Sequence, residues 1–175
     1  MGAICGVFER SGQATLPDRL AAMESALQRR APLEAGAISH GSVGLAARAL
    51  DKAAARDCGP WHDVTGKVAV VLDGVLLNRR ALMLELTGKD SAEMSAAEVV
   101  GHGYLAWGAQ VFARIEGAFA IAVWDAAKGA LMLARDGLGQ RPLLYAARGE
   151  TVNFASILPS LAADRRCTLG FDPAA

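Results

Sequence analysis

Four strand-like segments follow one another near the C-terminal end of the chain, and this pattern limits the fold more than any other feature. Gly-containing turns separate the segments, which cover residues 117–125, 129–135, 142–147 and 151–155. The first segment alternates small residues (Ala118, Ala120, Ala122) with large ones (Phe119, Ile121, Val123). Successive side chains of a strand point to opposite faces, so both faces of this strand are apolar. This favours a layered α/β sandwich with covered sheets over an exposed antiparallel sheet.

Helices and further strands are predicted before this region. Residues 3–9 read as a buried strand, and apolar residues at helical spacing predict an amphipathic helix over 16–30, with a start signal at Thr15 and Asp18. Two short strands are expected near 36–40 and 42–48. The segment 51–65 shows no periodicity and contains Gly59-Pro60, so we expect a surface loop there.

The middle of the chain continues the alternation of strands and helices. A β-branched run over 67–72 predicts a strand that ends in a tight turn at Asp73-Gly74. A short helix is expected over 79–86, and Ser95 with Glu98 forms a capping box for a helix that runs through Trp107. A last helix is expected to begin near Ile157. Gly137 and Gly139 join two predicted strands, which favours a hairpin turn over a phosphate-binding loop, because such a loop opens a helix.

Composition excludes several functional classes. Lys and Arg together number 18, as do Asp and Glu, so the net charge is zero and no nucleic-acid or anionic-membrane partner is expected. The longest apolar runs have strand length and are too short to span a membrane. The N-terminus lacks a basic region followed by an apolar core, so we expect no secretory signal. With no linker or repeat, we expect a single domain over residues 1–175; its apolar composition leaves a homo-oligomer open.

Cysteine and histidine usage gives no sign of a metal or disulfide framework. Cys5, Cys58 and Cys167 are widely spaced and odd in number, which favours a reduced, cytoplasmic setting. His40, His62 and His102 lack the spacing of metal ligands, so packing or surface roles are expected for them. We predict neither a metal nor a cofactor.

Motifs spread over nearly the whole chain resemble the class II glutamine amidotransferase domain of asparagine synthetases. The opening MGAICGVF is similar to the family's Met-Cys-Gly-Ile-x-Gly-hydrophobic-Phe, and ARDGLGQRPLLY is the most specific match. Further matches, in chain order, are RRAPL at residues 29–33, LDGVLLN at 72–78, SAAEV at 95–99 and EGAFAIAVWD at 116–125. The resemblance implies a four-layer αββα sandwich of the N-terminal-nucleophile (Ntn) hydrolase type, which agrees with the order of elements above.

The same resemblance implies that the glutamine-hydrolysing groups have been replaced. The family's nucleophile is an N-terminal Cys whose own α-amine acts as base, and Gly2 stands at that position. The family's oxyanion is held by an Asn side chain and the next Gly, and these are Asp73 and Gly74 here. A carboxylate about 4 Å from an oxyanion repels it by about 4 kcal/mol at an effective dielectric constant of about 20. Loss of the donor alone costs about 10²–10³ in rate.

The positions that bind glutamine in the family are also changed. Ala49, Val75 and Ala96 correspond to an Arg, a Glu and an Asp, so the former glutamine cleft consists of Ala49, Asp73, Val75 and Ala96. We predict no catalytic residue and no glutamine binding in this cleft. Arg48 lies one residue before the position of the family's Arg. If the alignment has a gap here, Arg48 takes that position; if it has no gap, the Arg48 side chain points to the opposite face of the strand.

Cys5 and the pair Arg29-Arg30 also lie in matched motifs and need an interpretation. Cys5 serves as nucleophile if the chain is processed to that residue, but as part of a central strand it reads as a buried free thiol. The pair Arg29-Arg30 follows a predicted helix end, where a favourable interaction with the helix dipole explains it without a ligand.

Three functions remain. The first is a non-catalytic domain that supports an ATP-dependent amide- or lactam-forming synthetase domain, in cis or in trans. β-Lactam synthetases and lasso peptide macrolactam cyclases, which resemble asparagine synthetase and have lost the nucleophile, are the examples. The apolar sheet edge of the domain and a 135–145 hairpin would pack on the partner domain. The second is an active glutaminase that uses Cys5. The third is a free-standing module that binds a protein or a metabolite in the old cleft.

Overall fold

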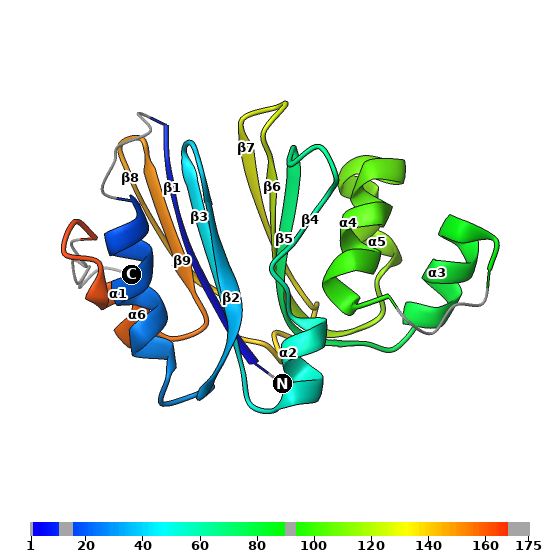
Figure 1. Ribbon diagram of the computed structural model, residues 1–175, viewed down its shortest axis with the longest axis horizontal. Helices are drawn as coiled ribbons and strands as arrows, with labels where there is room; N and C mark the ends of the chain where they lie inside the picture. The colour runs from blue at the N-terminus through cyan, green and yellow to red at the C-terminus, as the bar shows by residue number, and fades with distance from the viewer. Residues whose placement is uncertain (1, 11–15, 90–93, 168–175) are drawn as a thin grey trace.

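The computed structural model describes residues 2–10, 16–89 and 94–167, which form two antiparallel sheets with helices on both outer faces (Figure 1). The elements are, in chain order, β1 (Gly2–Glu9), α1 (Leu16–Leu27), β2 (Leu33–His40), β3 (Val43–Ala49), α2 (Lys52–Asp57), β4 (Trp61–His62), β5 (Val68–Leu76), α3 (Arg79–Thr87), α4 (Ala96–Trp107), the 3₁₀ turn η1 (Gly108–Gln110), α5 (Val111–Arg114), β6 (Gly117–Asp125), β7 (Ala130–Arg135), β8 (Leu144–Arg148), β9 (Thr151–Ala155) and α6 (Leu158–Ala163).

The layers follow the order helix, sheet, sheet, helix. One sheet has the strand order β2-β3-β1-β9-β8 and is covered by α1 and α6; the other has the order β4-β5-β6-β7 and is covered by α4, with α3 and α5 beside it (Figure 1). The predicted αββα sandwich is therefore confirmed. Among the described helices, none is long and apolar enough to cross a membrane.

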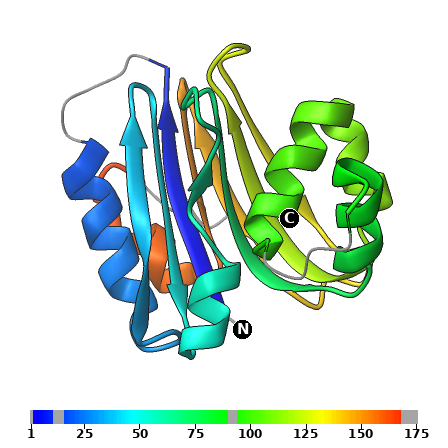
Figure 2. The same ribbon diagram turned by 45° about the vertical axis from the view of Figure 1, so that its right-hand side comes forward.

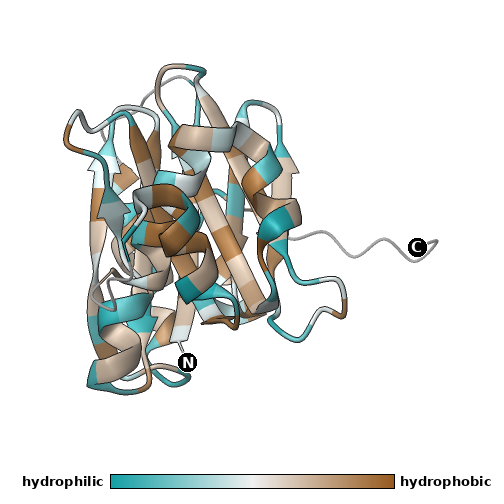
Figure 3. Ribbon diagram, turned by 90° about the vertical axis from the view of Figure 1, so that its right-hand side faces the viewer, coloured by the Kyte–Doolittle hydropathy of each residue, from teal (hydrophilic) through white to brown (hydrophobic). Residues whose placement is uncertain are grey.

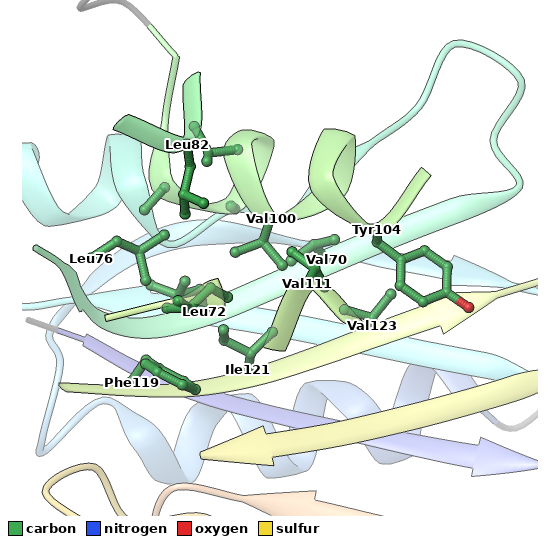
Figure 4. Packing of buried hydrophobic residues seen from close by; sticks show 14 of the residues in the cluster. Val70, Leu72, Leu76, Leu82, Val100, Tyr104, Val111, Phe119, Ile121 and Val123 are labelled. Carbon is green, nitrogen blue, oxygen red and sulfur yellow. The ribbon is translucent and has the colours of Figure 1, made fainter. Parts of the chain in front are cut away.

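Alternation along β6 builds two of the three apolar cores. Phe119, Ile121 and Val123 pack with Val100 and Tyr104 of α4 in the core between sheet and helices (Figure 4). Figure 3 looks onto this helical side and shows apolar residues on the helices and on the strands behind them. The opposite face of β6 joins the core between the sheets, whose small residues let the sheets approach: Ala47, Ala49, Ala69, Ala120 and Ala122. The third core lies between the five-stranded sheet and α1 and α6.

The sequence signals at helix ends agree with the structure where it describes them. Ser95 and Glu98 form the predicted capping box of α4. Helix α1 ends at Leu27, three residues before the predicted end, and Thr15 lies outside the described residues. Helix α6 starts one residue after Ile157, which is its N-cap.

Three local predictions were wrong. The segment 51–65 is not all loop, because Asp51 accepts a hydrogen bond from the Ala54 N–H (2.8 Å) and starts helix α2, and Trp61–His62 pair with β5. Strand β5 does not end at Asp73-Gly74 but continues to Leu76, still paired with β6. The segment between β7 and β8 is not a hairpin, since these strands belong to different sheets and residues 136–143 cross between them.

Candidate functional site

The first residue of β1 and a buried carboxylate of β5 meet between the two sheets. The Gly2 amide donates a hydrogen bond to Asp73 Oδ1 at 2.8 Å, across 71 positions of sequence. Asp73 is fully buried, and its Oδ2 has no hydrogen-bond partner in the described part of the chain. The two residues that the sequence placed at the nucleophile and oxyanion positions are therefore brought together, as an N–H donor and a carboxylate acceptor.

Neither glycine of this site has room for a side chain. A Cβ on Gly2 would lie 2.4 Å from the carbonyl oxygen of Arg48 on the neighbouring strand β3. A Cβ on Gly74 would lie 2.0 Å from the Ala118 carbonyl oxygen, and its φ of +147° is in the region that favours glycine. Gly74 is thus required by the close approach of β6 and not by the tight turn that the sequence suggested.

Arg30 closes the site from the segment that follows α1. Its Nη2 lies 3.7 Å from the unpartnered Asp73 Oδ2, and its Nε lies 3.5 Å from the Gly2 carbonyl oxygen. The sequence explained Arg30 by the dipole of the preceding helix; the structure adds a contact with Asp73, since α1 ends at Leu27 and the guanidinium turns toward that carboxylate. The positive charge partly offsets the burial of the carboxylate.

A small cavity opens beside Gly2, and we call it the Gly2 cavity. It has a volume of about 200 Å³ and is lined by residues from β1, from α2 and the residues next to it, and from β5. Figure 2 shows α2 beside the start of β1. Its lining residues are Gly2, Asp51, Ala53, Ala54, Asp57, Cys58, Gly74 and Val75. Of the predicted cleft residues, Val75 lines this cavity, whereas Ala49 is buried opposite Gly2 in the sheet.

The remaining cleft residue, Ala96, lies at the start of α4 and outside the Gly2 cavity. Its amide donates a hydrogen bond to Asp57 Oδ1 at 3.2 Å, and Asp57 also pairs with Arg79 at 2.7 Å. A larger cavity of about 820 Å³ adjoins at this point and shares Ala53 and Asp57 with the Gly2 cavity. Asp57 therefore connects Ala96 to the rest of the predicted cleft.

Cys5 lies in the interior of the fold, away from Gly2. It is fully buried in the core against α1 and α6, in the central strand of its sheet. Burial is the main cause that raises the pKa of the Cys5 thiol to about 12, although a hydrogen bond with Ser160 lowers it somewhat. At neutral pH this group is a thiol and not the thiolate that attacks an amide.

Arg48 points to the helix side of the sheet. Its Nε donates to the Ala31 carbonyl oxygen at 2.8 Å and its Nη2 to the Pro32 carbonyl oxygen at 2.5 Å. Ala49 on the same strand faces the opposite way, into the core between the sheets. In this structure Arg48 holds the chain after α1 and does not reach the Gly2 cavity.

Cys58 is a site residue that sequence reasoning missed. It lines the Gly2 cavity with only 3% of its surface exposed, and burial raises the pKa of its thiol to about 11, an effect to which nearby Asp73 adds. No motif or spacing singles out Cys58, since helix α2 and the turn after it bring it to Gly2. Asp57 and Arg30 were missed for a related reason, because their roles depend on the approach of distant segments.

No candidate metal centre was found in the described residues, where no three His, Cys, Asp or Glu side chains gather. His102 contacts the Trp61 ring, with 5.1 Å between ring centroids, and lies 3.9 Å from Glu98. His40 and His62, which are distant in sequence, line one further cavity at the other end of the sandwich.

The sequence of the chain is similar to parts of two asparagine synthetases. Over 96 residues the chain is 33% identical to asparagine synthetase [glutamine-hydrolyzing] 3 of Bacillus subtilis, covering 54% of this chain and 16% of that protein. Over 113 residues it is 31% identical to asparagine synthetase 2 of the same organism, covering 65% and 15%. The chain thus spans about a sixth of the length of these relatives.

A solved structure shares the fold. Glutamine phosphoribosylpyrophosphate amidotransferase from B. subtilis, complexed with ADP and GMP, superposes with a TM-score of 0.69 at 15% identity, over 92% of this chain and 43% of that chain. This likeness identifies the sandwich as the Ntn-hydrolase type found in glutamine amidotransferases. The sequence model of the glutamine amidotransferase domain family matches residues 1–175, and the chain belongs to that family.

Proposed function

We propose that residues 1–175 form one non-catalytic domain that does not hydrolyse glutamine and that supports an ATP-dependent amide- or lactam-forming synthetase domain, in the same polypeptide or in a partner. The observation that carries the proposal is the position of Gly2. This residue stands where the family has its nucleophile, its Cβ position is filled by the Arg48 carbonyl oxygen, and its amide is bonded to a carboxylate.

The electrostatics of the site support the loss of glutaminase activity. A tetrahedral intermediate formed beside Gly2 would meet the buried Asp73 carboxylate where the family has an amide donor. Hydrogen-bond donors at this point stabilise the developing negative charge, and an acceptor repels it. The positive charge of Arg30 is already directed at Asp73.

A direct assay tests the loss of activity. The purified protein is incubated with glutamine, and released ammonia is measured against a buffer blank and against Cys5→Ser. We expect both proteins to match the blank, and we expect a glutamine-like alkylating agent to leave Cys5 unmodified in mass spectra. Ammonia release above the blank that disappears in Cys5→Ser would contradict the proposal and support a glutaminase based on Cys5.

The edge formed by β8 and the preceding crossover supports a docking role. Leu138 is 86% exposed and Tyr145 is 69% exposed, and β8 pairs only with β9 among the described strands. Exposed apolar residues beside an unpaired strand edge are typical of an interaction surface. The Asp136 carboxylate accepts hydrogen bonds from four backbone N–H groups, three of them in the crossover, and these bonds define the shape of the segment. These features take the place of the expected 135–145 hairpin.

Docking is tested by charge substitution at this edge. The synthetase domain is expressed with the wild-type domain, with Leu138→Asp/Tyr145→Asp, or with Leu105→Asp, which alters an exposed leucine on α4. We expect the double variant to lose co-elution in size-exclusion chromatography and Leu105→Asp to keep it. Unchanged co-elution of the double variant would exclude this edge as the docking surface.

The type of synthetase follows from the missing ammonia source. A synthetase that takes its nitrogen from a substrate amine has no need of glutamine hydrolysis, and β-lactam synthetases and lasso peptide cyclases are such enzymes. Three free cysteines support a reducing, cytoplasmic location.

A further inference from the structure

The buried carboxylate of Asp73 carries more negative charge than its described neighbours offset. Its Oδ1 accepts a hydrogen bond from the Gly2 nitrogen at 2.8 Å, while its Oδ2 has no hydrogen-bond partner among the described residues. The Arg30 guanidinium comes within 3.7 Å of Oδ2, beyond hydrogen-bond distance, and 34% of that side chain is exposed. A fully buried carboxylate is strongly destabilising unless a cation lies close to it.

A neutral amide at Gly2 compensates this carboxylate poorly. An amide N–H has a single hydrogen and no net charge, so it bonds one oxygen and leaves the negative charge in place. A protonated α-amine at the same nitrogen carries a full positive charge and three hydrogens. At 2.8 Å from Oδ1, it would form a charge-assisted hydrogen bond with a carboxylate whose charge is shared between both oxygens.

Gly2 is a residue at which such an amine can arise. Methionine aminopeptidases remove the first methionine of nascent chains when the second residue is small, and glycine is the smallest. The fold requires glycine here for a separate reason, because a Cβ would lie 2.4 Å from the Arg48 carbonyl oxygen. Met1 itself lies outside the described residues. The packing of β1 against β3 therefore demands the residue that the peptidase accepts.

We propose that Met1 is removed and that the charged α-amine of Gly2 forms a buried ion pair with Asp73, which holds β1 to β5. In the hydrolysis, water supplies the hydroxyl of the released methionine's carboxyl group and one hydrogen of the new amine. The proton lost by that carboxyl group charges the amine, and α-amines are mostly protonated at neutral pH. The amine thus has a structural role, and this role does not depend on the proposed synthetase partner.

The mass of the intact protein tests the processing. For the full chain purified from cells, we expect the mass of the sequence less one methionine residue, and peptide sequencing should place Gly2 at the N-terminus. A chain that retains Met1 would overturn this inference alone. A chain that begins at Cys5 would contradict both this inference and the proposed loss of glutaminase activity.

Two matched forms of the protein test the ion pair. A fusion protein cut directly before Gly2 yields the Gly2 form, and a fusion cut one residue earlier yields an extended form with one additional glycine, whose amine is displaced from Asp73. Each form is made with and without Asp73→Asn, which keeps an acceptor for the Gly2 N–H but has no charge. We expect the additional glycine to lower the Tm by about 5 °C or more when Asp73 is present, and to have little effect in Asp73→Asn.

Asp73→Asn should accordingly have different effects in the two forms. In the Gly2 form it leaves a buried amine without a counter-ion and lowers the Tm, whereas in the extended form it removes an uncompensated carboxylate and leaves the Tm unchanged or higher. Asp18→Asn, exposed on α1, is the control and should act equally in both forms. If the additional glycine lowers the Tm equally with and without Asp73→Asn, its effect is steric and the ion pair is excluded; two wild-type forms that melt alike exclude it as well.

Discussion

Gly2 shows how a single residue decides the chemistry of this site. Family resemblance places a nucleophile at this position, but a reversion to cysteine would not simply restore it. The new Cβ would overlap the Arg48 carbonyl oxygen, and the amide of the same residue is already bonded to the Asp73 carboxylate. The lack of a side chain at Gly2 and the packing of β1 against β3 are therefore linked.

We expect Gly2→Cys to remain inactive and to be destabilised by about 1–3 kcal/mol, the cost of forcing atoms into a packed interior. Ammonia release from glutamine and urea unfolding measure the two effects. Gly137→Cys is the matched control, because no atom lies within 4 Å of the Cβ position of Gly137. Glutaminase activity in Gly2→Cys, with stability near that of wild type, would contradict the steric argument.

The sequence predicted the identity of the site residues better than their geometry. Gly2 and Asp73 do meet, and Cys5 is buried, because motif order and strand position carry this information. The turn assigned to Gly74 was wrong, since an Asp-Gly pair reads alike in a turn and in a strand that another strand approaches closely. Cys58 gave no local signal, and the signal at Arg30 indicated a helix end rather than a contact with Asp73, because tertiary packing brings both residues to this site.

Among the elements, the crossover between β7 and β8 depends on Asp136. Its carboxylate accepts hydrogen bonds from four backbone N–H groups, those of Phe119, Leu138, Gln140 and Arg141, at 2.9–3.2 Å. The bond from Gln140 is the main cause that lowers the pKa of Asp136, against the effect of burial. One side chain thus fixes the segment that passes between the sheets.

We expect Asp136→Asn to lower the Tm by roughly 3–8 °C. The Asn amide retains one acceptor oxygen. Its N–H₂ group replaces the second oxygen and faces the two backbone N–H donors that this oxygen accepted from. Thermal unfolding by circular dichroism gives the Tm, and Glu150→Gln in the exposed β8–β9 turn should change it little. A Tm of Asp136→Asn equal to that of wild type would mean that the crossover is held by other contacts.

A buried ionic cluster connects the five-stranded sheet to the helices that cover it. Arg19 of α1 pairs with Glu9 of β1 and with Asp164 after α6, at 2.7 Å for the latter, and Asn153 of β9 donates to Asp164. Burial alone would raise the pKa of Asp164, but the hydrogen bonds from Arg19 and Asn153 and from the Arg166 backbone lower it below its usual 3.8. The carboxylate is thus stabilised in its charged form.

We expect Asp164→Asn to cost about 3 kcal/mol at pH 7, because it leaves the buried Arg19 with a lost partner. The pKa of Asp164 is lower in the folded state, so its contribution is complete above about pH 4–5 and is lost as the pH falls below 3.8. Urea unfolding at pH 7 and pH 3 should therefore show a smaller difference from wild type at pH 3. The control is Asp18→Asn, because Asp18 is exposed on α1, next to Arg19. If Asp164→Asn lost as much stability at pH 3 as at pH 7, the ionic role of Asp164 would be contradicted.

Element order was predictable, and strand partners were not. Period-2 alternation and capping residues fix where β6 and α4 lie. They do not state which strands pair, so successive strands such as β7 and β8 read as a hairpin although they belong to different sheets. Helix α2 was missed because six residues give no periodicity, although the Asp51 cap followed by an Ala-rich run was a usable signal.

The whole molecule depends on a difference in side-chain size between its cores. The core under α4 is built from large side chains and the core between the sheets from many alanines, and β6 contributes to both. Large residues fill the irregular space between a helix and a sheet, while alanines allow two sheets to lie close. Neighbouring positions on β6 therefore tolerate opposite changes.

We expect Ile121→Ala to destabilise the protein by about 2–5 kcal/mol through the cavity it leaves under α4. Ala122→Leu, one residue along the strand, should also destabilise it, by about 1–3 kcal/mol, because it forces the sheets apart. Unfolding in guanidinium measures the loss of stability in both variants. Ile121→Val should lose less stability than Ile121→Ala, and Ala122→Gly should lose less than Ala122→Leu. A neutral Ala122→Leu beside a destabilising Ile121→Ala would contradict this account. It would mean that the space between the two sheets is wide enough for a larger side chain.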